Sequence, residues 1–210
     1  MTPAGGTAPV APRWLLLDID GVLLPAADLS AELRRDHGIT REQLRALMAS
    51  CFDACLVGEA DLAEELSPWL ERWEFAGSAR DFLEALFAAQ PEPEARLLQQ
   101  VAALREGGLL CGIASNQERW RASHLERSLE LARRFDERFF SCRLGSRKPQ
   151  ADFYRKIEGR LGVAAEAILF WDDRPENVAT ARERGWSAEL YTGPDGFEAA
   201  LESHRRRGLA

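Results

Sequence analysis

The sequence has little cysteine, no excess of basic residues and no long hydrophobic run. Four cysteines in 210 residues are too few for a disulfide-stabilised scaffold, and none of them shows the C-x-x-C spacing of a zinc site. Basic residues number 27 against 34 acidic ones, so the broad basic surface of a nucleic-acid-binding protein is absent. No apolar run approaches the ~18 residues of a membrane-spanning helix. We therefore expect a soluble, cytoplasmic protein with no nucleic-acid or membrane partner.

The composition is that of an ordinary globular protein, with 46% hydrophobic and 29% charged residues. The length fits one domain, or one domain that carries an insertion. Residues 1–13 are rich in Pro, Gly and Ala and are expected to form a disordered leader. Residues 14–27 begin with a short apolar run typical of a strand that is buried on both faces.

The rest of the chain divides into a helical part and an alternating part. Residues 28–93 show helical spacing and capping boxes but no strand pattern, which indicates a helical insertion. Residues 94–210 alternate between strand and helix patterns. The predicted strands are 109–114, 139–144, 167–171 and 186–191, and the predicted helices include 97–104, 119–134 and 153–161. This alternation predicts an α/β fold, with a doubly wound, Rossmann-like parallel sheet and a small helical insertion.

Polar residues follow three of the predicted strands, where open parallel sheets bind their ligands. These residues are Asp18 and Asp20, Ser115 and Asn116, and Asp172 and Asp173; Lys148 precedes a later helix. Acids alone would repel one another, but a divalent cation allows them to share a site. Mg²⁺ prefers one or two carboxylates together with phosphate oxygens, so the sequence predicts a site for Mg²⁺ and a phosphate group.

In order and spacing, this set of residues resembles the four signature motifs of the haloacid dehalogenase (HAD)-like hydrolases. The motifs are Asp18-Ile19-Asp20-Gly21-Val22, Ser115-Asn116, Lys148 in Gly145-Ser146-Arg147-Lys148-Pro149, and Asp172-Asp173-x-x-x-Asn177. The helical insertion resembles the C1 cap of subfamily IA. The stretch from Ser141 to Tyr154, followed by Phe170-Trp171-Asp172-Asp173, looks most like glucose-1-phosphatase-like sugar phosphatases. The resemblance implies a catalytic core at 14–27 and 94–210, with a cap at 28–93.

The resemblance also implies roles for single residues. Asp18 would be the nucleophile that forms an aspartyl-phosphate, and Asp20 the general acid and base. Ser115, Asn116 and Lys148 would bind the phosphoryl oxygens, Ser115 and Asn116 doing so at a helix N-terminus. Mg²⁺ would be held by Asp18, by the Asp20 backbone carbonyl and by Asp173, with Asp172 supporting from outside the metal's ligands. The expected activity is the Mg²⁺-dependent hydrolysis of a small phosphate ester, such as a sugar phosphate.

Other activities are weighed against this one. A phosphomutase of the same fold would transfer the phosphoryl group to a sugar hydroxyl. A relative without activity could bind a ligand or partner, although no assigned catalytic residue is missing. A response-regulator receiver is shorter and has its acid pair at the first strand. Dehalogenation needs no proton donor, so Asp20 favours phosphoryl chemistry.

Some of these residues also have plain structural interpretations. Ser115 could cap a helix through the capping box Ser115-x-x-Glu118. The aromatic residues of the insertion are expected in its core rather than in a substrate pocket, and the histidines on the surface. These are Trp69, Trp73 and Phe75, and His37, His124 and His204. The segment Leu23-Leu24-Pro25 could form a flap beside the cap.

Overall fold

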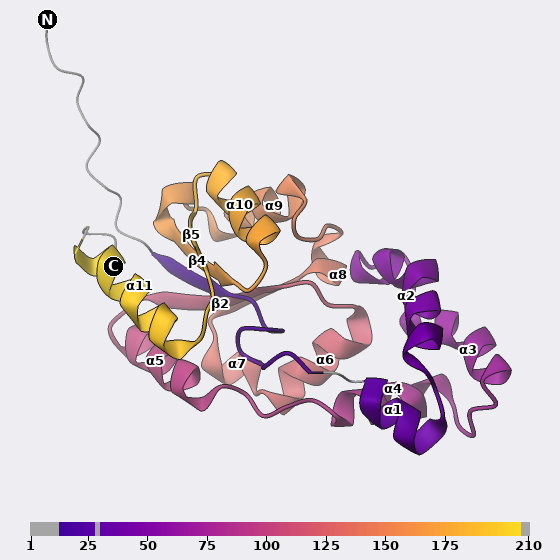
Figure 1. The fold of residues 1–210 in the computed structure, drawn as a ribbon. Coiled ribbons are helices and arrows are strands. Elements are labelled where there is room, and N and C mark those ends of the chain that lie inside the picture. Colours follow the sequence, from indigo (N-terminus) through magenta and orange to yellow (C-terminus); the bar gives the residue numbers. More distant parts are fainter. Residues whose placement is uncertain (1–12, 28–29, 207–210) are drawn as a thin grey trace, which may run out of the picture.

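The computed structural model describes residues 13–27 and 30–206 (Figure 1). The leader expected at residues 1–13 lies, except for Arg13, outside the described residues. None of the described helices combines the length and apolar character needed to cross a bilayer.

Five parallel strands form one sheet in the order β3-β2-β1-β4-β5. The strands are β1 (Trp14–Leu17), β2 (Leu110–Ser115), β3 (Glu137–Phe140), β4 (Ile168–Asp172) and β5 (Ser187–Leu190). β1 lies at the centre, where Leu17 pairs with Ile113 on one side and Trp171 on the other. The predicted doubly wound parallel α/β fold is confirmed. This strand order brings the carboxyl ends of β1, β2 and β4 together at one edge.

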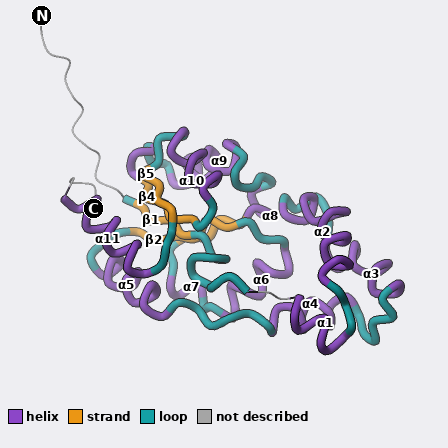
Figure 2. Tube along the Cα trace, in the orientation of Figure 1, coloured by secondary structure: helices purple, strands orange, loops and turns teal. Residues whose placement is uncertain are grey.

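Helices cover both faces of the sheet (Figures 1 and 2). Alternate residues of β1 point to opposite faces, so each face carries apolar side chains that the helices bury. Leu15 and Leu17 belong to one buried cluster, and Trp14 and Leu16 belong to the other. The first face is covered by α5 (Ala95–Glu106), α6 (Arg119–Ser128), α7 (Leu131–Arg134) and α11 (Pro194–Arg206). The second is covered by α9 (Ala151–Leu161) and α10 (Pro175–Glu183), and a 3-10 turn (Ala165–Ala167) precedes β4.

Where the structure describes the segment between β1 and α5, its regular elements are helices, and they have a hydrophobic core of their own. Its helices are α1 (Ser30–His37), α2 (Arg41–Leu56), α3 (Leu62–Arg72) and α4 (Ala79–Ala88). The predicted capping boxes begin α2 at Thr40 and α4 at Ser78. The two ends of the segment lie side by side, since the Glu94 N–H donates to the Leu23 carbonyl at 2.8 Å. The segment's described residues 30–93 are called the helical insertion below.

The structure corrects two predicted elements. The strand expected at 139–144 is β3 followed by a short helix, α8 (Ser141–Leu144), because the ladder with β2 ends at the Phe140–Ser115 pair. The helix expected at 119–134 is broken between α6 and α7. Glu130 adopts a left-handed conformation there, with φ of 48°.

Candidate active site

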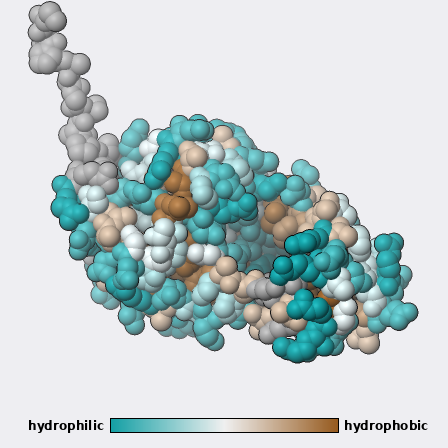
Figure 3. All heavy atoms as spheres, viewed as in Figure 1, coloured by the Kyte–Doolittle hydropathy of each residue, from teal (hydrophilic) through white to brown (hydrophobic). Residues whose placement is uncertain are grey.

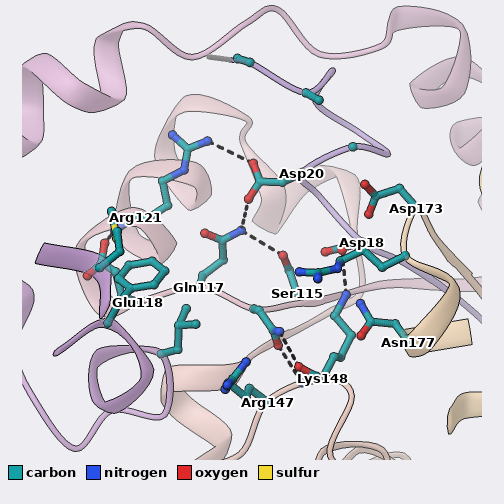
Figure 4. Close-up of a pocket in the computed structure, with 18 of the residues that line it drawn as sticks. Asp18, Asp20, Ser115, Gln117, Glu118, Arg121, Arg147, Lys148, Asp173 and Asn177 are labelled. Carbon is teal, nitrogen blue, oxygen red and sulfur yellow. Dashed lines mark hydrogen bonds and ion pairs between the residues drawn. The ribbon is translucent and has the colours of Figure 1, made fainter. Parts of the chain in front are cut away.

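A cavity of about 500 Å³ lies between the carboxyl edge of the sheet and the helical insertion. It is lined by six of the predicted site residues: Asp18, Asp20, Ser115, Asn116, Lys148 and Asp173. Asp18 directly follows β1, and its N–H donates to the Trp171 carbonyl of β4 at 3.0 Å. This hydrogen bond holds Asp18 at the edge of the sheet where β1, β2 and β4 end. Figure 4 shows these side chains converging on one space.

Lys148 is the cation at the floor of this cavity and is almost fully buried, at 1% exposure. Its Nζ lies 2.8 Å from Asp18 Oδ2 and 2.5 Å from Asp172 Oδ2. Burial disfavours the charged amine, but the two carboxylates outweigh burial and raise the pKa of Lys148. Lys148 therefore remains protonated and holds the Asp18 side chain in place.

Asp18 has an unusual protonation equilibrium. Burial raises its pKa from 3.8 to about 7, and the charge of Asp172 adds to this effect, while Lys148 opposes it. An attacking carboxylate must be ionised. A second cation beside Asp18 would lower its pKa and keep the carboxylate ionised at neutral pH.

The two acids at the end of β4 have different environments. Asp172 is fully buried; its Oδ1 accepts hydrogen bonds from Asn177 Nδ2 at 2.8 Å and from the Arg174 N–H at 2.9 Å. With Lys148 on Oδ2, both oxygens of Asp172 already have partners. Asp173 is exposed and lines the cavity. This difference supports Asp173 as the acid available to a metal, with Asp172 orienting Lys148.

The acid cluster fits a small divalent cation. Carboxylate oxygens of Asp18, Asp172 and Asp173 lie within 4.8 Å of one another. Gly21 leaves the space for this arrangement, because a Cβ at that position would lie 2.2 Å from Asp173 Oδ2. Hard carboxylate oxygens next to a space that could admit phosphate oxygens are the donors that Mg²⁺ prefers.

Asp20 projects into the cavity from the turn after β1, and two side chains hold it, one from the loop after β2 and one from the first turn of α6. Gln117 Nε2 donates to Asp20 Oδ2 at 2.7 Å, and Arg121 Nη2 to Asp20 Oδ1 at 3.3 Å. Gln117 also donates to Ser115 Oγ at 3.0 Å. The sequence patterns did not single out Gln117 or Arg121. The available signal was their polarity within seven residues after the strand predicted at 109–114.

The start of α6 differs from the sequence prediction. The N-cap is Glu118, whose carboxylate accepts from the Trp120 N–H at 2.7 Å and the Arg121 N–H at 2.5 Å. The interpretation of Ser115 as the helix cap is therefore wrong. Ser115 and Asn116 therefore lie in the loop that precedes α6, and their expected contact with a phosphate group stays a prediction. Burial raises the pKa of Glu118.

The Asn116 side chain has a structural partner. Its Nδ2 donates to the Lys148 carbonyl at 2.9 Å, and its Oδ1 accepts from the Lys148 N–H at 2.8 Å. This two-way pairing ties the loop that carries Lys148 to the end of β2. Ser115, at 1% exposure, presents its hydroxyl at the same edge.

The segment expected to form a flap, Leu23-Leu24-Pro25, closes a tight turn beside Asp20. The Leu24 N–H donates to the Ile19 carbonyl at 2.9 Å, and the Gly21 N–H to the Leu24 carbonyl at 2.8 Å. Leu23 and Leu24 are buried, whereas Pro25 lines the cavity.

The helical insertion supplies an apolar wall opposite the acids. Its lining residues are Met48, Phe52, Leu56, Leu62, Leu86 and Phe87. Trp69, Trp73 and Phe75 pack against the insertion's own core instead, and they are not among the residues that line the cavity.

Of the three histidines expected at the surface, one is buried. His204 is 2% exposed, and its Nε2 lies 3.0 Å from Glu189 Oε1. His124 is half-buried and stacks near Phe87, while His37 is exposed. His204 packs against Trp171 on the covered face of the sheet, so its apolar surroundings explain the difference.

Comparison with known proteins places the chain in a family. The sequence profile of the haloacid dehalogenase-like hydrolases matches residues 12–185. A predicted HAD-like hydrolase from Porphyromonas gingivalis has a similar structure, with a TM-score of 0.78 and 21% identity over 94% of this chain and 99% of that one. A HAD family enzyme from Bacteroides thetaiotaomicron, solved with magnesium and inorganic phosphate, has a TM-score of 0.73 and 18% identity over 86% and 94%.

Flavin mononucleotide hydrolase 1 of Arabidopsis thaliana is 38% identical over 77 residues, which are 37% of this chain and 31% of that protein. The match thus spans about a third of that curated relative. The chain belongs to the haloacid dehalogenase-like hydrolases, as its four motifs predicted. The assignment to subfamily IA and to the sugar-phosphatase branch stays a prediction.

Proposed function

We propose that this hydrolase is a Mg²⁺-dependent phosphatase that acts on small phosphate monoesters through an aspartyl-phosphate. The observation that carries the proposal is the contact of Lys148 Nζ with Asp18, at 2.8 Å, in a cavity that Asp20 and Asp173 also line. A carboxylate and a cation so arranged suit attack on an anionic phosphorus centre.

In the first step, an oxygen of Asp18 attacks phosphorus, and the bond from phosphorus to the ester oxygen breaks. Asp20 transfers its proton to that leaving oxygen. In the second step, Asp20 takes a proton from water, the water oxygen attacks phosphorus, and the phosphorus bond to Asp18 breaks. Gln117 and Arg121 keep the Asp20 carboxylate in position for both transfers.

Lys148, the Ser115 hydroxyl and the Asn116 backbone N–H are the proposed phosphate-binding groups. Without cations, a carboxylate that approaches a phosphate dianion is opposed by about 4 kcal/mol per charge pair at 4 Å and an effective dielectric of 20. Lys148 offsets part of this repulsion and neutralises charge as the reaction proceeds.

Asp18 and Asp173 carboxylate oxygens and the Asp20 carbonyl would hold Mg²⁺. The ion supplies further positive charge for the phosphoryl oxygens and for Asp18. The magnesium and phosphate in the Bacteroides thetaiotaomicron enzyme support this proposal, and so does the phosphate ester named for the Arabidopsis thaliana relative.

We further propose that residues 28–93 form the cap of this hydrolase and that 14–27 with 94–210 form its catalytic core. Separate hydrophobic clusters in the two parts support this division. The apolar wall that the insertion adds to the cavity suits a compact substrate, and the proposed partner is accordingly a small molecule.

The test is phosphate release from phenyl phosphate with and without Mg²⁺. We expect Mg²⁺-dependent turnover in the natural protein and a loss of at least about 1,000-fold in Asp18→Asn, since the amide cannot attack phosphorus. Glu84→Gln is the control, because this exposed acid of the helical insertion pairs with Arg80 and neither residue lines the cavity. Turnover that persists in Asp18→Asn overturns the assigned nucleophile.

A further inference from the structure

Arg121 is a buried cation whose second terminal nitrogen has no hydrogen-bond partner among the described residues. It projects from the first turn of α6, is 9% exposed and lines the same cavity as Asp20. Its Nη2 donates to Asp20 at 3.3 Å, whereas Nη1 is sealed from solvent. A buried donor without an acceptor is costly, so a turn of the guanidinium that brings Nη1 to a ligand oxygen would be favoured.

Arg121 lies on the side of the cavity where the leaving group of the phosphate ester would lie. Figure 4 shows Arg121 on the far side of Asp20 from Asp18. Asp20 is the proposed proton donor to the leaving oxygen, so the group attached to that oxygen extends past Asp20. The Phe87 ring of α4, whose centroid lies 5.5 Å from the guanidinium carbon, bounds the same region.

The charges around Arg121 favour an uncharged hydroxyl over a carboxylate on the leaving group. Arg121 carries one positive charge, but Asp20 contacts it and Glu118 caps its helix from three residues away. The other arginines lining the cavity already have acidic partners, Arg147 at Asp53 and Arg174 at Glu176. A carboxylate on the leaving group would meet two acids, whereas a hydroxyl brings an acceptor for Arg121 and no charge.

We propose that Arg121 is a substrate-binding residue that donates from Nη1 to an uncharged hydroxyl oxygen on the alcohol part of the phosphate ester. The preferred substrates are therefore polyol phosphates rather than phosphorylated carboxylic acids. This inference rests on the proposed phosphatase activity and deepens it by assigning a substrate class.

The experiment compares kcat/KM for glycerol 1-phosphate, 2-phosphoglycolate and propyl phosphate in the natural protein and in Arg121→Met. Propyl phosphate has an alkoxide leaving group like that of glycerol 1-phosphate but no further hydroxyl, so any effect of Arg121 through Asp20 lowers both rates to a similar extent. We expect the natural protein to prefer glycerol 1-phosphate over 2-phosphoglycolate. In Arg121→Met, the ratio of kcat/KM for glycerol 1-phosphate to that for propyl phosphate should fall roughly 10- to 100-fold.

Arg127→Met is the matched control, because Arg127 is exposed on the same helix and is not among the cavity-lining residues. In this variant, the ratio of kcat/KM for glycerol 1-phosphate to that for propyl phosphate should equal the ratio in the natural protein. Arg121→Lys keeps a charge but loses the forked donor, and it serves the same comparison if the methionine variant does not fold.

An unchanged ratio with both rates lowered means that Arg121 only positions Asp20, and it overturns the inference. A natural preference for 2-phosphoglycolate overturns the choice of an uncharged group. Either result leaves phosphate release from phenyl phosphate intact, so the proposed phosphatase activity survives both. If no ester is hydrolysed, the proposed function fails, and the inference fails with it.

Discussion

Gly21 is the residue at which backbone conformation and metal chemistry coincide. Its φ is 80°, a left-handed conformation that favours glycine, and a Cβ there would lie 2.2 Å from Asp173 Oδ2. The residue that turns the chain between Asp20 and Leu24 thus also leaves the space in which Asp173 approaches Asp18. A side chain at this position would disturb both features.

Gly21→Ala should therefore weaken metal binding as well as stability. We expect the Mg²⁺ concentration for half-maximal turnover to rise at least about tenfold, because Asp173 must move. Strain at positive φ should also lower the free energy of unfolding by about 1 kcal/mol. Mg²⁺ titration of phosphate release and urea denaturation measure the two effects.

Gly108→Ala is the matched control for this variant. Gly108 has a φ of 94°, but a Cβ there meets nothing within 4 Å. It should lose similar stability without any change in Mg²⁺ dependence. Equal Mg²⁺ dependence in both variants would contradict the role given to Gly21.

At the residue scale, the sequence could predict the acids and the lysine but not the groups that hold them. Asp18, Lys148 and Asp173 stand at motif positions whose order alone indicated a shared site. The contacts of Gln117 and Arg121 with Asp20 depend on where α6 begins. That start lies at Glu118, three residues later than the capping box Ser115-x-x-Glu118 suggested.

At the scale of elements, Asp136 joins a helix to two strands. It directly precedes β3. Its carboxylate accepts hydrogen bonds from Arg105 of α5, from Nε at 3.1 Å and from Nη2 at 2.6 Å. It also accepts one from the Cys111 N–H of β2 at 2.8 Å. The bidentate contact with Arg105 holds the pKa of Asp136 below its ordinary value of 3.8. Both side chains are half-buried.

Because the pKa of Asp136 is lower in the folded state, its ionisation stabilises the fold above the unfolded pKa. That contribution is lost as pH falls through the folded value. Asp136→Asn should lower the free energy of unfolding by about 1.5–3 kcal/mol at pH 7. It should also flatten the fall in stability below pH 3.8.

Urea denaturation of both proteins from about pH 7 to pH 2 measures this difference. Glu84→Gln is the control, since the Arg80–Glu84 pair is exposed on α4 and should contribute less than about 0.5 kcal/mol. A parallel pH dependence in Asp136→Asn and the natural protein would refute the assignment.

The elements themselves were predictable where a pattern was long or capped. The boxes at Thr40 and Ser78 marked the starts of α2 and α4, and Pro175 begins α10 in its first turn. The run 139–144 was ambiguous, because a short apolar stretch fits a strand or a helix equally well. Only the end of pairing with β2, a long-range property, decides that a helix begins at Ser141.

At the scale of the whole molecule, the helical insertion and the sheet are joined by polar contacts that flank the cavity. Asp61, the N-cap of α3, accepts from Trp120 Nε1 at 2.8 Å and from Arg119 Nη1 at 3.0 Å. The Trp120 ring also packs against the core of the insertion. Figure 3 shows the hollow between the two parts.

Trp120→Phe should loosen the contact between the two parts while it keeps most of the packing. Loss of one hydrogen bond should lower the free energy of unfolding by about 0.5–1.5 kcal/mol and raise KM several-fold for small esters. Steady-state kinetics and urea denaturation measure both quantities.

Trp73→Phe, within the insertion alone, is the control and should leave KM unchanged. The same KM in both variants would show that the contact at Asp61 does not hold the insertion over the cavity.

The hydrogen bond between Leu23 and Glu94 has a consequence for how such molecules diversify. Because the chain leaves and re-enters the sheet domain at neighbouring points, the intervening helices form a module with adjacent ends. Recombination at this junction could replace the module without disturbing any strand. The chemistry at Asp18 and the contact at Arg121 would then be inherited, while the apolar wall of the cavity would evolve separately.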